Sequence, residues 1–283
     1  MKTDQQLKDL VKEKYSEIAE QSLEQNASSC CGATCGCSTI DASIMAESYS
    51  DLKGYHADAD LGLGCGLPTE FALIKEGDTV IDLGSGAGND AFIARAIAGA
   101  EGKVIGIDMT EKMIEKAKVN AAKLGYKNVD FRLGDVEDLP VASKVADVIV
   151  SNCVLNLVPN KAKAFEEAFR VLKPGGHFSV SDIVLEGELP ENLKKVAEMY
   201  AGCISGAIQK EEYLRIVKEA GFTAITLQKE RVISIPEEIL KNYLTETEVT
   251  AFLQSKSKIV SINLYAERAA EEKKSCCGPA CCN

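Results

Sequence analysis

Apolar residues near the start of the chain recur at helical spacing. Leu7, Leu10, Val11 and Ile18 lie three, four or seven positions apart. This periodicity predicts an amphipathic helix over residues 4–24. We expect its apolar side to serve in packing.

From residue 77 onward the pattern changes to short apolar runs that alternate with amphipathic segments. The runs predict strands at 79–83, 104–108, 130–133, 145–150 and 177–181, with helices at 90–98, 110–124 and 161–172. Strands that alternate with helices at this spacing predict an α/β fold, a doubly wound parallel sheet covered on both faces. A further helix at 210–221 precedes two late strands, at 223–229 and 258–266, which we expect to return to the edge of this sheet.

The charge balance narrows the range of partners. The chain has 32 Lys and Arg against 43 Asp and Glu, a net charge of −11, and no run rich in Lys or Arg. Binding to phosphate backbones needs a positive surface, so we expect no nucleic acid partner. No stretch approaches 18 uninterrupted apolar residues, and Met1 leads into a charged helical pattern rather than an apolar signal region. We therefore expect no membrane partner and a cytoplasmic protein.

Cysteine is the unusual component, with 11 residues. An odd count without an export signal does not favour a framework of structural disulfides, so we expect reduced thiols held for metal, metalloid or redox chemistry. Three pairs are vicinal: Cys30–Cys31, Cys276–Cys277 and Cys281–Cys282. Immediate neighbours are too close for ordinary disulfide geometry. These pairs either capture a metal or metalloid for transfer inward, or belong to dispensable segments that bind soft ions.

A glycine-rich turn follows the first predicted strand. Asp82 precedes a G-x-G-x-G sequence formed by Gly84, Gly86 and Gly88, with Ser85 inside it. A dinucleotide-binding turn would have its third glycine one position later. In a doubly wound sheet, ligands bind beyond the carboxyl ends of the strands, where this turn lies.

The turn resembles motif one of the class I S-adenosylmethionine-dependent methyltransferases, which have a Rossmann-like sheet. Asp108 ends the second strand, 24 residues after Gly84, and suits a carboxylate that accepts both ribose hydroxyls. Asp135, after the third strand, fits the contact with the adenine amino group in that superfamily. The predicted cofactor-binding residues are Asp82, Gly84, Ser85, Gly86, Gly88, Asp108, Met109, Asp135, Val136 and Asn152.

Five cysteines lie outside the vicinal pairs, and four of them are candidate site residues: Cys37, Cys65, Cys153 and Cys203. A single cysteine near an apolar strand is more often a small core residue than a ligand. Cys153, however, follows the strand at 145–150 and lies at the edge of the sheet where ligands bind. Four thiols near a methyl-donor site are harder to explain as core residues.

Four segments together resemble the arsenite (arsenic(III)) S-adenosylmethionine methyltransferases: Asp82–Asp90, Leu63–Pro68, Ser151–Leu157 and Cys203–Ala207. The resemblance covers residues 35–267, and the doubled cysteines near both ends depart from it.

The resemblance implies that Cys153 and Cys203 hold arsenic(III), with Cys65 as a third thiolate. It implies that Cys37 pairs with Cys65 in a disulfide relay that regenerates the thiols. It also implies arsenite or its thiol conjugate as substrate, a thioredoxin- or glutathione-type reductant as co-substrate, and a role in arsenic detoxification.

The chemistry of arsenic agrees with these residue types. Arsenic(III) is soft and prefers thiolate ligands. Its lone pair attacks a methyl group without losing a proton, so no general base is needed. Two other hypotheses remain: a quinone- or sterol-type small-molecule methyltransferase with incidental cysteines, and a thiol-rich protein that sequesters metalloid without turnover.

These expectations divide the chain into four regions. Residues 1–66 form an N-terminal helix and Cys-rich region, and residues 67–182 an S-adenosylmethionine-binding Rossmann-like domain. Residues 183–267 form a C-terminal substrate region, and residues 268–283 a mobile Cys-rich tail.

Overall fold

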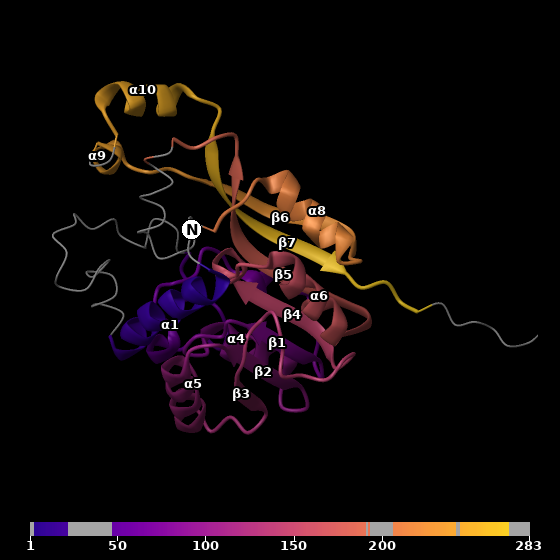
Figure 1. Ribbon diagram of the computed structural model, residues 1–283. Helices are drawn as coiled ribbons and strands as arrows, with labels where there is room; N and C mark the ends of the chain where they lie inside the picture. Colours follow the sequence, from indigo (N-terminus) through magenta and orange to yellow (C-terminus); the bar gives the residue numbers. More distant parts are fainter. Residues whose placement is uncertain (1–2, 22–46, 191, 193–205, 242–243, 272–283) are drawn as a thin grey trace, which may run out of the picture.

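The computed structural model describes residues 3–21, 47–190, 192, 206–241 and 244–271. Cys37, Cys203 and the three vicinal cysteine pairs lie outside these ranges. A seven-stranded sheet forms the centre of the described chain (Figure 1). Its strands are β1 (Thr79–Leu83), β2 (Lys103–Asp108), β3 (Val129–Leu133), β4 (Ala146–Asn152), β5 (Leu172–Glu186), β6 (Thr223–Ile233) and β7 (Lys258–Glu267).

The strand order is β3-β2-β1-β4-β5-β7-β6. The first five strands pair in parallel, which confirms the predicted doubly wound sheet. β7 runs antiparallel between β5 and β6, so both late strands belong to the same sheet. β5 crosses the predicted boundary at residues 182–183, and the two central regions therefore share one sheet.

Two strands extend well beyond their predicted C-terminal ends, and β5 also begins earlier than predicted, at Leu172 rather than at 177. β5 continues to Glu186, whereas the pattern predicted an end at 181, because the polar pair Ser181-Asp182 interrupts the apolar run. The structure pairs both polar residues with β7 and buries them, and the strand continues through Ile183. β6 likewise extends to Ile233 rather than to residue 229.

Helices cover both faces of the sheet (Figure 1). α4 (Asn89–Ala98) and α5 (Glu111–Lys123) pack on one face, and α6 (Lys161–Val171) and α8 (Lys210–Glu219) on the other. α1 (Asp4–Glu20) lies against α5. Thr3 starts α1 with a capping box to Gln6. The helix ends at Glu20 instead of the predicted 24, because Gln21 adopts an extended backbone.

The distal ends of β5, β6 and β7 reach beyond the main body and carry two short helices (Figure 1). These are α9 (Glu237–Leu240) and α10 (Glu246–Gln254), which connect β6 to β7 and which the hydrophobic pattern did not predict. A separate apolar cluster fills this end of the molecule: Cys65, Cys153, Ile183, Leu185, Leu189, Ile233, Leu240, Leu244, Val249 and Ile259. The other short helix that bears on the site is α3 (Pro68–Phe71), directly after the Cys65 turn.

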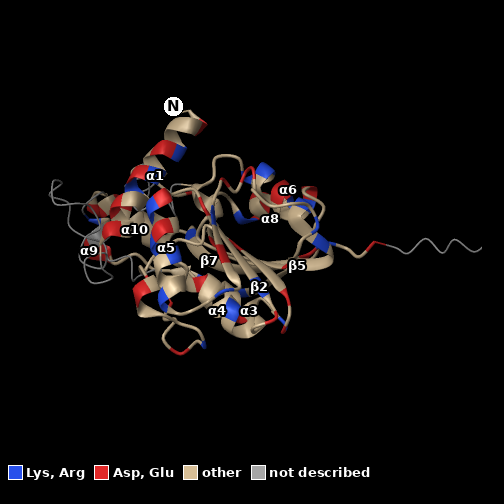
Figure 2. Ribbon diagram, turned by 90° about the horizontal axis from the view of Figure 1, so that it is seen from below, with Lys and Arg blue, Asp and Glu red and all other residues tan. Residues whose placement is uncertain are grey.

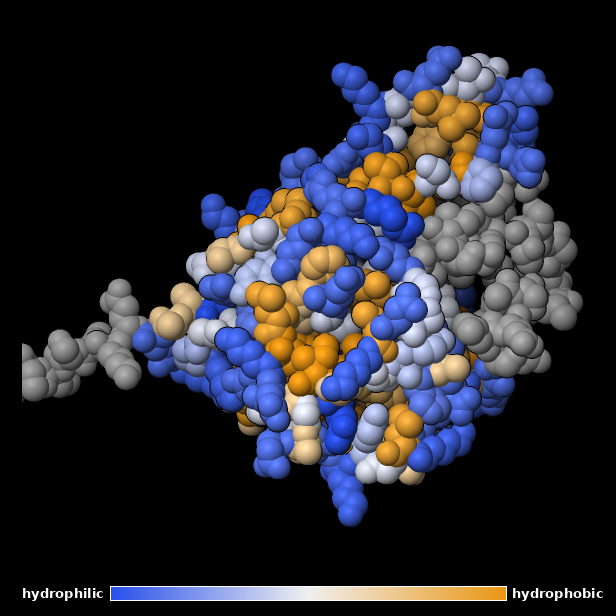
Figure 3. All heavy atoms as spheres, turned by 180° about the vertical axis from the view of Figure 1, so that it is seen from behind, coloured by the Kyte–Doolittle hydropathy of each residue, from blue (hydrophilic) through white to orange (hydrophobic). Residues whose placement is uncertain are grey.

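Basic and acidic residues are interspersed along the helices (Figure 2), and on the face in Figure 3 hydrophobic residues form separate areas between hydrophilic ones. Among the described residues, every helix is too short or too polar to cross a membrane.

Candidate active site

The glycine turn after β1 has a backbone that other residues would not adopt. Gly84, Gly86 and Gly88 all have positive φ, at 66°, 50° and 100°. A Cβ at Gly84 would lie 2.2 Å from a methyl carbon of Val154. Gly88 is the N-cap of α4, so the turn ends where this helix begins. The turn therefore brings the backbone close to the loop that follows β4.

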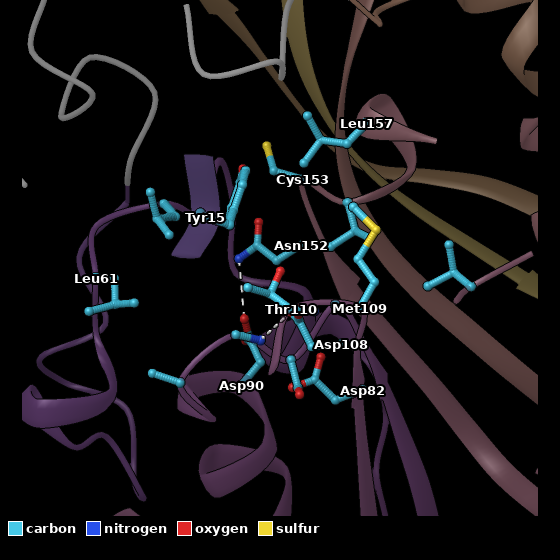
Figure 4. Close-up of a pocket in the computed structure, with 18 of the residues that line it drawn as sticks. Tyr15, Leu61, Asp82, Asp90, Asp108, Met109, Thr110, Asn152, Cys153 and Leu157 are labelled. Carbon is cyan, nitrogen blue, oxygen red and sulfur yellow. Dashed lines mark hydrogen bonds between the residues drawn. The ribbon is translucent and has the colours of Figure 1, made fainter. Parts of the chain in front are cut away.

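A pocket opens at the carboxyl ends of β1, β2 and β4, next to this turn. Nine of the ten predicted cofactor-binding residues line it: Asp82, Gly84, Ser85, Gly86, Asp108, Met109, Asp135, Val136 and Asn152. Gly88 is not among the lining residues. Figure 4 shows Asp82 and Asp108 at one end of the pocket, Cys153 and Leu157 at the other, and Asn152 between them.

Three of the aspartates that line the pocket, Asp82, Asp90 and Asp108, are buried. Burial, then the charges of Asp90 and Asp108, raise the pKa of Asp82 well above its usual value. Burial raises the pKa of Asp90 to about 6, against hydrogen bonds from Tyr49 and Asn152 that lower it. Burial also raises the pKa of Asp108, although the amides of Thr110 and Gly86 donate to its carboxylate at 2.8 and 3.0 Å. Such a cluster favours a cationic ligand.

Asp135 is held differently. Lys8 of α1 donates to Asp135 and to Glu137, at 2.7 Å in each case. Burial would raise the pKa of Asp135, but the hydrogen bond from Lys8, the Glu137 amide and the nearby charges of Lys8 and Lys12 lower it overall. α1 thus lies over the pocket, which Val11 and Tyr15 also line.

Three buried polar atoms in the lining have no hydrogen-bond partner among the described residues. They are Oδ2 of Asp82, Oγ of Ser85 and Oδ1 of Asn89. Buried polar groups are normally satisfied, so these atoms indicate a polar ligand. A carboxylate also has room for more donors than Asp108 receives from the protein. The lining therefore fits S-adenosylmethionine, a cation that carries ribose hydroxyls and an ammonium group.

Cys65 and Cys153 are joined by a disulfide across 88 residues of sequence. The convergence of these two sulfurs agrees with the predicted thiol site. Their state does not agree with the expectation of reduced thiols, and in this structure Cys65 is bonded to Cys153 rather than to Cys37. The physical reason is proximity: the turn before α3 and the loop after β4 meet at the same strand ends, with the two Cα atoms 5.9 Å apart.

Asn152 fixes the turn that carries Cys65. Its Oδ1 accepts the Cys65 amide at 3.0 Å, and its Nδ2 donates to the Gly66 carbonyl at 2.8 Å and to Asp90 at 3.3 Å. On the other side, Ser261 of β7 donates to the Cys65 carbonyl at 2.7 Å. Asn152 therefore connects the acidic end of the pocket to the thiol end.

The two cysteines differ in access to the pocket. Cys153 lines it, whereas Cys65 is completely buried behind it. Cys153 also has φ 58°, a left-handed conformation that is uncommon for residues other than glycine and that occurs often at functional sites. Its amide donates to the Ser181 carbonyl at 2.8 Å, which holds the strained backbone in place.

The sequence did not reveal Tyr49, Asp90 or Lys8 as pocket residues. Tyr49 donates to Asp90 at 3.0 Å, and its fully buried phenol has a pKa raised well above its usual value, by burial and then by the charge of Asp90. Asp90 lies two residues beyond Gly88, the last glycine of the motif, and this position is the only local signal for it. Lys8 reaches residues 127 and 129 positions away, and no local pattern reports such a contact.

The fold and the pocket agree with the comparisons with known proteins. A family model described as a methyltransferase domain matches residues 74–221, more than half of the chain, so the chain is a methyltransferase by class. The arsenite methyltransferase of Halobacterium salinarum is 40% identical over 238 residues, covering 79% of this chain and 59% of that protein. The human arsenite methyltransferase is 34% identical over 221 residues, covering 75% of this chain and 58% of that protein.

A solved structure gives the same result. The arsenic(III) S-adenosylmethionine methyltransferase of Chlamydomonas reinhardtii superposes with a TM-score of 0.63 at 30% identity, covering 82% of this chain and 75% of that one. The chain belongs to the arsenic(III) S-adenosylmethionine methyltransferase family. It spans about three fifths of the length of the Halobacterium and human relatives.

Proposed function

We propose that this protein transfers methyl groups from S-adenosylmethionine to trivalent arsenic held by thiolates, giving methylated arsenicals. The observation that carries the proposal is the position of Cys153. Its side chain lines the same pocket as the carboxylates of Asp82 and Asp108, and its sulfur is within bonding distance of a second cysteine, Cys65.

The acidic end of the pocket would hold the donor. Asp108 would accept the ribose hydroxyls, and Asp82 and Asp90 would attract the positive charge. S-adenosylmethionine, when bound, supplies an electrophilic methyl group on a sulfonium. The apolar residues around Cys153, among them Val154 and Leu157, would keep water away from the thiol end.

The thiol end requires reduction before it can hold arsenic. A dithiol reductant of the thioredoxin type, or two glutathione molecules, would supply two electrons and two protons and convert the Cys65–Cys153 disulfide to two thiols. Each thiol then replaces one hydroxyl of arsenite and releases one water. Thiolates are the ligands that soft arsenic(III) prefers.

Cys203 is the proposed third thiolate. It lies outside the described residues, and the support comes from its neighbour in sequence, Gly206. A Cβ at Gly206 would lie 1.5 Å from the carbonyl oxygen of Asn156, so the chain that follows Cys203 contacts the loop that carries Cys153. Cys37 remains the proposed partner of Cys65 in a relay that regenerates the thiols, and detoxification remains the proposed purpose.

The product spectrum tests this function. Reduced protein incubated with arsenite, S-adenosylmethionine and glutathione should yield methylated arsenicals, measured by chromatography with arsenic-specific detection. Cys153→Ser and Cys203→Ser should each abolish product while donor affinity, measured by calorimetry, stays within twofold of the wild-type value. Full activity in either variant would refute the thiol site. Stoichiometric arsenic binding without turnover would favour sequestration, and methylation of a quinone but not of arsenite would favour the small-molecule alternative.

A further inference from the structure

Three buried polar side chains lie beneath the loop that carries Cys153, and arsenic methylation as proposed does not use them. They are Asp182 of β5, Tyr213 of α8 and Lys161, the first residue of α6. Asp182 and Tyr213 are completely buried, and Lys161 is 8% exposed. None of the three lines the donor pocket. Any effect of these side chains on the donor pocket therefore acts through a neighbouring segment of the chain.

That segment is the loop of residues 153–158, which contains the short 3-10 helix Leu155–Leu157. The backbone amide of Asn156 donates to the Asp182 carboxylate. Lys161 Nζ donates to the Val158 carbonyl at 3.1 Å and to the Asn156 carbonyl at 3.5 Å. One N–H group and two carbonyl groups of the loop backbone are thus hydrogen-bonded to these buried side chains.

The same carboxylate also reaches α8. Tyr213 Oη donates to Asp182 Oδ2 at 2.8 Å. Two bonds to one buried carboxylate make a direct connection between the loop after β4 and the helix that follows Gly206. Because a Cβ on Gly206 would clash with the Asn156 carbonyl, these two segments also touch through their backbones.

The groups are costly to bury, which argues against a purely structural origin. Burial raises the pKa of Asp182 to about 7, opposed by the Tyr213 hydrogen bond, the Lys161 charge and the Asn156 amide. Burial also lowers the pKa of Lys161, opposed by the charges of Asp182 and Glu137. Apolar side chains of similar size often stabilise a fold as well as a buried ion pair does, so such groups are better explained by a geometry that they specify.

We propose that Asp182, Lys161 and Tyr213 form a polar clamp that positions the 153–158 loop, and with it the Cys153 sulfur, at the donor pocket. These are positioning residues, since none contacts the donor or the proposed arsenic. The inference rests on the proposed function, because it takes Cys153 as a ligand of the methyl acceptor. The effect of the clamp on the loop itself can be measured without any substrate.

Tyr213→Phe is the sharpest variant, because it removes one hydroxyl and keeps the ring in the core. Tyr265→Phe is the matched control: Tyr265 Oη donates to Glu267 at the same 2.8 Å, on β7 and away from the loop. Tyr213→Phe should lower kcat for arsenite methylation about tenfold, leave the donor dissociation constant within twofold, and speed amide hydrogen exchange in the 153–158 peptide about tenfold. Tyr265→Phe should change none of the three.

A double-mutant comparison distinguishes a clamp that acts as one unit from side chains that act independently of one another. If the clamp acts as one unit, Lys161→Met combined with Tyr213→Phe should lower kcat by much less than the product of the two single effects. Wild-type kcat and loop exchange in Tyr213→Phe would overturn the proposal. Equal losses of kcat and donor affinity in both Tyr→Phe variants would also overturn it, since they would indicate general destabilisation.

The exchange experiment needs no arsenite, so the two proposals fail separately. If the wild-type protein makes no methylated arsenical, the proposed function is wrong. Faster exchange of the 153–158 amides in Tyr213→Phe would still support the clamp, and unchanged exchange would refute it.

Discussion

Reduction of the Cys65–Cys153 disulfide should destabilise the fold while it activates the thiol site. The bond closes a loop of 88 residues. A loop of that length restricts the unfolded chain by an entropy that corresponds to about 4.6 kcal/mol at 25 °C, an upper value because native strain and residual structure reduce it. The oxidised protein should therefore be the more stable form.

The expected shift in melting temperature follows from chain length. A folded chain of 283 residues has an unfolding entropy of roughly 0.6 kcal/mol/K near 60 °C, so 4.6 kcal/mol corresponds to about 8 °C. Thermal unfolding followed by circular dichroism, with and without a phosphine reductant, measures this shift. Arsenite binding, measured on a variant in which the three vicinal cysteine pairs are changed to serine, should appear only after the Cys65–Cys153 disulfide is reduced.

Cys65→Ser is the control for the other cysteines of the chain. It should melt at the temperature of the reduced wild-type protein, with or without reductant. A wild-type melting temperature that reductant leaves unchanged would refute the reasoning, and so would tight arsenite binding by the oxidised form of the variant without vicinal pairs.

Three further predictions concern the donor pocket. Gly84→Ala should weaken donor binding, measured by calorimetry, at least tenfold, because its Cβ would meet Val154. Gly77→Ala is the control: Gly77 also has a positive φ, but a Cβ there would have nothing within 4 Å, so donor binding should not change. Donor affinity should rise between pH 5 and 7, because Asp90 ionises near pH 6 and then attracts the cationic donor. Asp90→Asn should flatten this pH profile, and a steep profile in that variant would exclude Asp90 as the source of the pH dependence. Lys8→Met should raise KM for the donor severalfold and leave KM for arsenite unchanged, because it removes the ion pairs over the pocket; equal changes in both constants would contradict this.

Local patterns were sufficient for the parallel sheet and for most of the donor pocket. The strand that ends at Asp108 and the turn that begins at Gly84 each combine periodicity with a residue of special chemistry, and both lie in contiguous sequence. The same applies to α10 in hindsight, because Thr245 and Glu248 form a capping box that is visible in the sequence. The absence of a long apolar repeat concealed this helix.

Contacts between distant segments could not be derived in this way. The ion pair of Lys8 with Asp135 and the disulfide of Cys65 with Cys153 depend on how strands far apart in sequence are ordered in the sheet. Asp182 was hidden for a related reason: it lies in a strand that is buried on both faces, where a carboxylate interrupts the apolar pattern that marks strands. The predicted strand ended at residue 181, directly before Asp182, and the structure buries Asp182 beneath the site.

The most direct test of the account uses a chain that keeps only Cys65, Cys153 and Cys203, with the other eight cysteines changed to serine. This protein, reduced, freed of reductant and mixed with one equivalent of arsenite and methyl-labelled S-adenosylmethionine, should transfer one labelled methyl group to arsenic in a single turnover. If label stays on the donor while arsenite binds, or if arsenite fails to bind to these three thiols, the central claim is wrong.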